Sequence, residues 1–295
     1  MSLRLAHLSD AHIGPLPRPQ RRELLGKRFM GYLNWTRSRA YIHDMGMLGR
    51  LVEDIRAHRP DHVAMTGDIL NIGLRAEFPL ARLWLETLGP PQDVSFVPGN
   101  HDAYAKGTMP DLAATFAPWT CSDAETNAPY PYLRVRKQVA LIGLASGIPT
   151  PPVVATGRLG HAQCAALAKM LEDCAAAGFI RVIMIHHPPH RGGATIGRGL
   201  SDSAEFEAII AANGAELILH GHNHKASVAR IAGPKRPVPI VGVASASAIR
   251  GTLTHRVGYH LFEIEGTAED YHIHGRARGM IPGTSEIGDL GKIEI

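Results

Sequence analysis

Cysteine is scarce in this sequence, and long apolar runs are absent. The three cysteines, Cys121, Cys164 and Cys174, are an odd number with no C-x-x-C pair, which argues against a disulfide framework and a thiolate zinc site. Any metal bound here must therefore use nitrogen and oxygen ligands. The longest apolar stretch, residues 139–154, is broken by glycine and proline and falls short of the roughly 18 residues that a membrane helix needs. Asp10 and two histidines occupy the region where a secretory signal would be apolar, so we expect a cytoplasmic protein.

An excess of positive over negative charge is found in one segment of the sequence and not in the remainder. The net charge is +4, and residues 18–39 hold seven basic residues against Glu23 alone, which leaves 24 basic and 26 acidic residues elsewhere. A protein that binds duplex nucleic acid gains its affinity mainly by neutralising phosphates over a broad basic face. The slightly acidic remainder offers no such face, so we expect no duplex nucleic acid as a partner and rank a nuclease low.

The basic segment 18–39 also carries bulky apolar residues. Those at helical spacing are Leu25, Phe29, Tyr32 and Leu33. Gly26 and Gly31 weaken the prediction of a helix. One interpretation is a solvated helix, within an insertion at about residues 15–43, that packs its aromatic side chains on the domain. The other is an element that meets an anionic substrate or an anionic lipid surface, which would place the protein at the inner membrane surface.

Short runs rich in valine, isoleucine and leucine predict buried strands, and five of them end in polar clusters. These strands are expected at residues 3–8, 62–66, 94–97, 182–185 and 217–219. Helical stretches lie between or after them, at residues 44–58, 76–88, 161–177 and 202–212. The pattern predicts an α/β layered fold in which the carboxyl ends of the strands share one edge.

The pattern changes beyond residue 235. Strands without intervening helices are expected at residues 238–243, 259–264 and 271–274. They predict a second, more antiparallel sheet. No linker rich in glycine, serine or proline separates two domains, so we expect residues 1–295 to form a single domain.

The polar clusters at the five strand ends contain residues that bind metals. They are Asp10, His12, Asp68, Asn100, His186, His222 and His224. Each cluster alone has a structural explanation, such as a turn, but seven ligands at one edge are more than one metal needs. Carboxylate and imidazole ligands suit zinc, manganese or iron, and a bridging carboxylate holds two ions about 3.5–4 Å apart. The sequence therefore predicts a dinuclear hydrolytic centre.

The spacing within two clusters suggests how their side chains converge. Asp10 and His12 are two residues apart, and so are His222 and His224. If each strand end stays extended, both members of a pair point to the same side. Each pair would then approach one metal.

The clusters form five ordered blocks that resemble the calcineurin-like metallophosphoesterase family, whose pattern is D-x-H, G-D, G-N-H-D/E, H and G-H-x-H. The blocks are Asp10-Ala11-His12, Gly67-Asp68, Gly99-Asn100-His101-Asp102, His186 before His187-Pro188-Pro189, and Gly221-His222-Asn223-His224. The resemblance covers about residues 3–245. Its H-H-P-P and G-H-N-H context is similar to that of bacterial cyclic-nucleotide phosphodiesterases of the family.

The resemblance implies a fold, a ligand set and a reaction. The fold is a β-sandwich of two mixed sheets flanked by helices. The implied ligands are Asp10, His12, Asp68 and His224 for one metal, and Asp68, Asn100, His186 and His222 for the second, with Asp68 as the bridge. Two ions, manganese, iron or zinc, would activate a hydroxide for in-line attack on phosphorus. His101 matches the family histidine that contacts the phosphoryl group or protonates the leaving oxygen.

One position departs from the family pattern. Family phosphatases often carry an aspartate three residues after the bridging aspartate, where it supports the catalytic histidine, and this chain has Asn71. A neutral amide orients an imidazole but does not stabilise an imidazolium as a carboxylate does. The departure favours a substrate with a good leaving group, such as a diester or a pyrophosphate.

Three functions of different kinds follow from these observations. The first is a phosphodiesterase or pyrophosphatase that acts on a small nucleotide-type substrate. The second is hydrolysis of a lipid-linked UDP-sugar at the membrane surface, with residues 18–39 as the acyl or membrane contact. The third is a non-catalytic binding scaffold of the same fold, like the retromer subunit that resembles these enzymes.

Substrate choice in such a site would depend on three loops. They are expected at residues 13–43, 103–131 and 190–201. Arg191 and Arg198 in the third loop would either reach a substrate phosphate or remain solvated.

Overall fold

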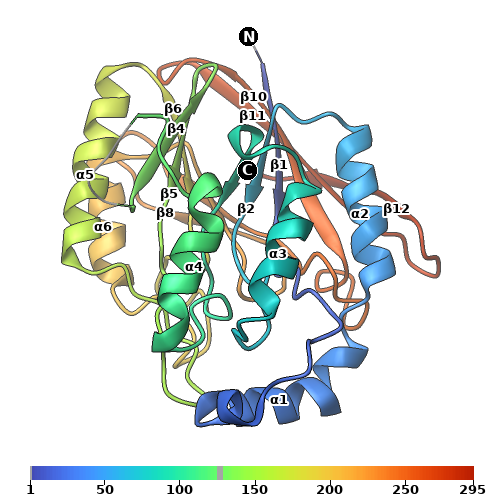
Figure 1. Ribbon diagram of the computed structural model, residues 1–295. Helices are drawn as coiled ribbons and strands as arrows, with labels where there is room; N and C mark the ends of the chain where they lie inside the picture. Colours follow the sequence, from blue (N-terminus) through green and yellow to red (C-terminus); the bar gives the residue numbers. More distant parts are fainter. Residues whose placement is uncertain (1, 125–128) are drawn as a thin grey trace.

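Two mixed sheets pack face to face and carry helices on their outer sides in the computed structural model, which describes residues 2–124 and 129–295 (Figure 1). The first sheet has the order β12-β11-β10-β1-β2-β3, and the second has the order β4-β5-β6-β7-β9-β8. The predicted sandwich of two mixed sheets flanked by helices is therefore confirmed.

The strands of the first sheet are β1 (Leu3–Leu8), β2 (His62–Met65), β3 (Val94–Phe96), β10 (Gly258–Gly266), β11 (Tyr271–Met280) and β12 (Ile287–Ile293). Those of the second sheet are β4 (Tyr132–Arg136), β5 (Val139–Gly143), β6 (Ile180–Met184), β7 (Leu217–His220), β8 (Ser227–Ile231) and β9 (Val238–Gly242). The helices are α1 (Lys27–Arg37), α2 (Met45–Ala57), α3 (Glu77–Glu86), α4 (Met109–Phe116), α5 (His161–Ala176) and α6 (Ser203–Asn213). All the strands and helices expected from the sequence are present, whereas α4 and the strands β4, β5, β8 and β12 were not expected.

The strands beyond residue 235 do not form a separate sheet, so that prediction was wrong. β9 joins the second sheet in parallel to β7, while β10 pairs antiparallel with β1, from Leu3 opposite Ile264 to His7 opposite His260. β1 pairs with β2 on one side only, which leaves its other edge open to a returning strand. β10, β11 and β12 therefore extend the first sheet.

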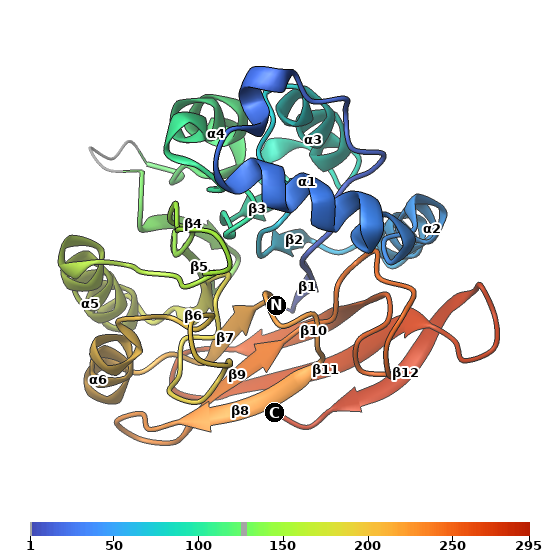
Figure 2. The ribbon, with the colours of Figure 1, turned by 90° about the horizontal axis from the view of Figure 1, so that it is seen from below.

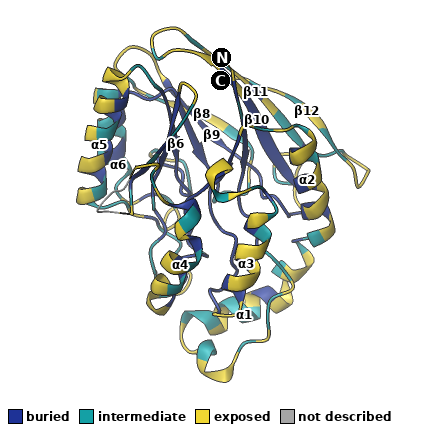
Figure 3. Cartoon of the chain, turned by 45° about the horizontal axis from the view of Figure 1, so that its top comes forward, coloured by how far each residue is buried: buried dark blue, intermediate teal, exposed yellow. Residues whose placement is uncertain are grey.

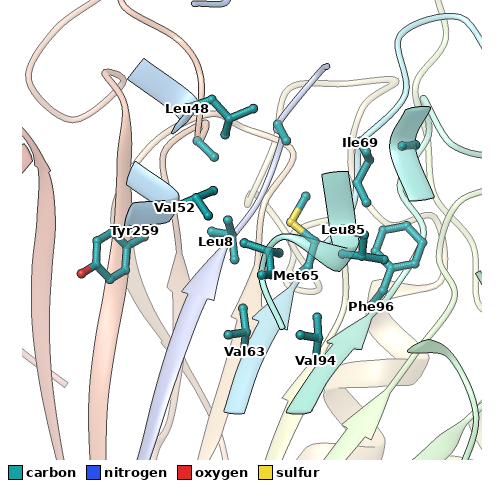
Figure 4. Packing of buried hydrophobic residues seen from close by; sticks show 14 of the residues in the cluster. Leu8, Leu48, Val52, Val63, Met65, Ile69, Leu85, Val94, Phe96 and Tyr259 are labelled. Atoms are coloured by element: carbon teal, nitrogen blue, oxygen red, sulfur yellow. The ribbon is translucent and has the colours of Figure 1, made fainter. Parts of the chain in front are cut away.

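The apolar runs are buried because the strands are covered on both faces. Leu5 of β1, Val182 of β6 and Phe262 of β10 belong to a cluster in which residues of the two sheets meet. On the outer side of the first sheet, Leu8 and Met65 pack with residues of α2 and α3 (Figure 4). The outer helices are accordingly buried on one side and exposed on the other (Figure 3). Each fully buried large apolar side chain contributes about 1.5–3 kcal/mol to stability.

The segment of residues 15–43 lies between β1 and α2, and its helix α1 crosses the end of the molecule at the carboxyl ends of the strands (Figures 1 and 2). Trp35 is the buried residue of α1 and stacks over His43, with ring centroids 6.3 Å apart. Leu25 and Phe29 remain 76% and 49% exposed. The interpretation in which aromatic side chains pack on the domain therefore holds for Trp35 and not for Phe29.

None of the described helices is both long and apolar enough to cross a membrane.

Candidate metal centre

The predicted ligands come from loops that follow strands of both sheets. Asp10 and His12 follow β1, Asp68 follows β2 and Asn100 follows β3 in the first sheet. His186 follows β6, and His222 and His224 follow β7 in the second sheet. We predicted that all these strand ends share one edge of one sheet. They instead lie at the edges of two sheets, and these edges are neighbours because the sheets pack face to face.

Most of these residues have an unusual backbone conformation. Five of the eight non-glycine residues with positive φ in the described part of the chain are predicted ligands: Asp10, His12, Asp68, His222 and His224. The expectation that each strand end stays extended was therefore wrong. Backbone hydrogen bonds, such as that from the His12 N–H to the Asp68 carbonyl at 3.0 Å, hold the turned loops against one another. Strained backbone of this kind concentrates at functional sites.

The first group of ligands surrounds the Asp10 carboxylate. Its Oδ1 atom lies 3.2 Å from Nε2 of His224 and 3.9 Å from Nε2 of His12. The two imidazole Nε2 atoms are 3.3 Å apart. Asp10 Oδ1 is buried and accepts no hydrogen bond from the described residues. An acceptor left unsatisfied in this way is costly unless a cation or another donor completes it.

The second group surrounds His186. Its Nε2 atom lies 3.3 Å from Oδ2 of Asp68 and 3.3 Å from Nδ1 of His222. Nδ1 of His222 is also 2.9 Å from Oδ1 of Asn100. Asp68 and Asp10 both belong to a buried triad with His186 that is close enough to share an ion. Asp10 is therefore the carboxylate that the two groups share, whereas Asp68 lies in the second group, and its bridging role stays a prediction.

Backbone carbonyls orient two of the rings. Nδ1 of His12 donates to the Leu70 carbonyl at 3.0 Å, and Nδ1 of His186 donates to the Thr66 carbonyl at 2.6 Å. Nε2 of each ring then faces the carboxylates. This is the arrangement by which proteins fix the tautomer of a metal-binding histidine.

The surroundings of the centre shift the pKa values of its carboxylates and imidazoles in different directions. Burial alone would raise the pKa of Asp68, but His186 and His101 hold it well below its usual range. Burial would lower the pKa of His186, yet Asp68 and Asp10 raise it to about 9. Burial and the neighbouring His186 lower the pKa of His222 to about 3. Ionised carboxylates beside neutral imidazoles form a donor set that fits divalent cations.

Asp102 organises the centre without facing it, and the sequence reasoning gave it no role. Its Oδ2 accepts the N–H groups of Asp68 and Gly99, at 2.7 and 2.8 Å, and its Oδ1 accepts those of Ile69 and Leu70, both at 3.0 Å. The buried carboxylate thereby ties the loop after β2 to the loop after β3. Its place at the end of the G-N-H-D block was the available signal.

His101 lies beside the ligands, and its contacts correct one expectation. Its backbone N–H donates to Oδ1 of Asp68 at 2.7 Å, and its Nδ1 contacts the backbone carbonyl of Asn71. The Asn71 side chain donates instead to the Ile13 carbonyl at 2.7 Å. The side chain at position 71 therefore does not support the imidazole, and the main chain of Asn71 contacts it instead.

The ligands open into a cleft of about 980 Å³. The segment of residues 15–43 lines it with Lys27, Met30, Arg39 and His43, a contribution from individual residues that the sequence did not reveal. Nζ of Lys27 donates to Oγ1 of Thr150 at 2.7 Å and so links α1 to the loop after β5.

The three predicted loops contribute unequally to the cleft. The loop at 190–201 contributes Arg198, whereas Arg191 pairs with Glu207 at 2.8 Å. The loop at 103–131, of which 125–128 lie outside the described residues, contributes Tyr104. Residues 152–155 also line the cleft and were not expected. His187, which was assigned no metal, uses Nδ1 for a 2.8 Å hydrogen bond with Ser146.

Comparison with known proteins relates this geometry to a family. A sequence profile described as calcineurin-like phosphoesterase matches residues 3–226, although no curated protein matches the chain. Among solved structures, a dimetal phosphatase from Danio rerio is 13% identical, with a TM-score of 0.62 over 99% of both chains. A purple acid phosphatase from yellow lupin seeds is 13% identical, with a TM-score of 0.59 over 98% of this chain and 53% of its own. A 5'-nucleotidase precursor from Thermus thermophilus is 15% identical, with a TM-score of 0.54 over 93% of this chain and 54% of its own.

Proposed function

Because the chain belongs to the calcineurin-like phosphoesterase family, we propose that it is a dinuclear-metal hydrolase that cleaves a phosphodiester or pyrophosphate bond of a small nucleotide-type substrate. The observation that carries the proposal is the convergence of two buried carboxylates and several imidazoles beside a cleft of about 980 Å³. The whole of residues 1–295 acts as one domain, with residues 15–43 as an insertion over the cleft.

The ligand assignment follows the resemblance to the family. Asp10, His12, Asp68 and His224 would hold one ion, and Asp68, Asn100, His186 and His222 would hold the other. The proximity of His12 and His224 to Asp10, and of His186 to Asp68, supports it. Two such cations, manganese, iron or zinc, supply positive charge for the phosphoryl oxygens and an activated water as the nucleophile.

The protein's own groups position that chemistry. Asp102 fixes the loops that carry Asp68 and Asn100, and the carbonyls of Thr66 and Leu70 hold two imidazoles in place. Rigid support of this kind keeps the reacting groups in line.

The cleft supports a nucleotide-sized anionic substrate. Its volume of about 980 Å³ lies at the upper end of ordinary small-molecule sites. Lys27, Arg39, Arg198 and Lys225 line it and provide positive charge. His101 is oriented by a neutral carbonyl and not by a carboxylate, which favours a leaving group that needs little help from an acid. A diester, such as the bond that bacterial cyclic-nucleotide phosphodiesterases cleave, or a pyrophosphate fits this better than a monoester.

The proposal is tested by rates on bis-p-nitrophenyl phosphate and p-nitrophenyl phosphate after metal removal and manganese reloading. The proposed enzyme prefers the diester, needs metal and loses turnover in Asp68→Ala, while the surface variant Asp289→Asn keeps the wild-type rate. If wild-type protein shows no metal-dependent turnover on either compound or on cyclic nucleotides and nucleotide-linked diphosphates, the catalytic proposal fails. A non-catalytic binding scaffold then becomes the better account.

A second candidate substrate, a lipid-linked UDP-sugar, is favoured by the exposure of α1 and the residues before it. Leu25, Phe29 and Met30 are 76%, 49% and 53% exposed beside basic residues of segment 18–39. Such a surface suits an anionic bilayer, where the protein would bind peripherally on the cytoplasmic side. Flotation with phosphatidylglycerol vesicles tests this, because Phe29→Ser should lose binding while Leu83→Ser, at a residue of α3 that is 61% exposed, should keep it. Equal flotation of the two variants would remove this candidate.

A further inference from the structure

Arg39 extends from the short helix η2 (Arg39–Tyr41), after α1, to the edge of the metal centre. Its Nη1 atom lies 2.9 Å from Nε2 and 3.2 Å from Nδ1 of His101. It lines the same cleft as Asp68, Asn100 and His222. A residue from the segment of residues 15–43 thus touches the histidine beside the predicted ligands.

The guanidinium of the half-buried Arg39 lacks the partners that other buried or half-buried arginines have. Arg134 donates to the backbone carbonyls of Pro91, Val94, Pro118 and Cys121. Arg181 pairs with Glu216, and Arg28 donates to the carbonyls of Ile72 and Gly73. Within the described part of the chain, Arg39 has only His101 as an acceptor, and no carboxylate oxygen lies within 4.0 Å. Most of its donors therefore have no acceptor among the described residues.

Arg39 is half-buried in the wall of the cleft. Its partial withdrawal from water lowers its pKa from the ordinary value, and the carboxylates of Asp68 and Asp10 offset this only through space. A guanidinium with free donors in this position is placed to bind an anion that enters the cleft.

His101 cannot complete it alone. A guanidinium has five N–H donors and no acceptor, whereas a neutral imidazole offers one lone pair. Nδ1 of His101 faces the Asn71 carbonyl and carries the hydrogen, so Nε2 is the only acceptor available to Arg39. The remaining donors are free to bind an acceptor with several oxygens that enters the cleft.

We propose that Arg39 is a catalytic residue that binds the non-bridging oxygens of the substrate phosphoryl group. A guanidinium matches two phosphoryl oxygens at once and gives stronger, charge-assisted hydrogen bonds. This inference rests on the proposed phosphoesterase function. It makes the segment of residues 15–43 part of the active site, because that segment delivers the charge that meets the substrate.

Two measurements test the proposal, and the first is anion binding. Manganese-loaded protein is titrated with inorganic phosphate in a calorimeter, without any turnover. Arg39→Gln should weaken phosphate binding by about 10-fold or more, the usual effect of losing one charge-assisted contact. Arg82→Gln, an exposed arginine on α3, should bind phosphate as the wild type does. Bound manganese, measured by elemental analysis, should be equal in all three proteins.

The second measurement is steady-state kinetics on the best diester found. Arg39→Gln should lose about 100-fold or more in kcat/KM, a typical cost of removing one donor to a developing oxyanion. Arg39→Lys should recover part of the loss, and added guanidinium should partly restore Arg39→Ala. Rescue by the small cation would exclude a purely structural role.

The outcomes separate this inference from the function on which it rests. If phosphate affinity and kcat/KM of Arg39→Gln stay within twofold of Arg82→Gln, the inference is overturned. It is also overturned if Arg39→Lys and Arg39→Gln lose manganese or unfold alike, because Arg39 would then be structural. If the wild type hydrolyses nothing while phosphate binding still depends on Arg39, the anion site stands and the phosphoesterase proposal falls.

Discussion

Replacing Asp102 with asparagine should destabilise the protein strongly although the two side chains have nearly the same shape. The buried carboxylate accepts four backbone N–H groups, two on each oxygen, from Asp68, Gly99, Ile69 and Leu70. An asparagine keeps one acceptor oxygen and presents an NH₂ group in place of the other. Whichever way the amide lies, two backbone N–H groups point at another donor.

The size of the effect follows from those two groups. A buried donor left without an acceptor costs about 1–3 kcal/mol, so Asp102→Asn should lose about 2–6 kcal/mol. Because whole proteins are stable by only about 5–15 kcal/mol, this is a large fraction of the total. Packing contributes little to the loss, since the volume is conserved.

Equilibrium unfolding in urea, followed by tryptophan fluorescence, measures this loss directly. Asp289→Asn, which breaks an exposed ion pair with Arg276, is the matched control and should cost at most about 1 kcal/mol. Because Asp102 holds the loops of Asp68 and Asn100, its variant should also bind manganese more weakly. A loss below about 1 kcal/mol would refute the role assigned to the four hydrogen bonds.

Three further predictions concern other parts of the molecule. Gly99→Ala should lose metal binding, measured by elemental analysis after dialysis, because a Cβ atom there overlaps the Asp68 carboxylate; Gly107→Ala, with open space around it, should not. Burial lowers the pKa of His260 from 6.5 to about 3. Its neutral form therefore contributes fully to stability above pH 6.5, and acidification to pH 5 should lower the free energy of unfolding by about 2 kcal/mol. As the pH is lowered below 6, the free energy of unfolding in urea should therefore fall by about 1.4 kcal/mol per pH unit more in the wild type than in His260→Leu. Equal slopes for the two proteins would contradict the burial argument. Glu216→Gln strands its buried arginine partner and should cost about 3–5 kcal/mol in urea, whereas a cost near zero would show that the pair is hydrated.

The residues of the candidate metal centre could be predicted from the sequence, because metal binding requires particular side chains and these stand at the ends of strands. Asp10, Asp68 and His186 needed only their types and their order to be identified, and the structure gathers them. Their backbone geometry was not predictable from strand periodicity. The left-handed conformation of Asp10 and His12 depends on hydrogen bonds to the loop after β2, which are distant in sequence.

The segment of residues 15–43 was the least predictable part of the fold. Gly31 counts against a helix by intrinsic propensity, yet it lies within α1. A Cβ atom at this position would come within 2.7 Å of Cγ2 of Ile72 and would overlap the hydroxyl of Tyr104. The glycine therefore lets the helix approach the domain closely, which only tertiary contacts can reveal. The position of Arg39 depends on that approach.

The origin of the predicted ligands in both sheets has a consequence for biosynthesis. A ribosome releases the chain from its amino terminus, so Asp10 and Asp68 emerge long before His222 and His224, which follow β7. A nascent chain that ends before β7 lacks ligands for both ions of the proposed centre. Loading with metal would thus mark a chain as finished, and incomplete products would stay without it.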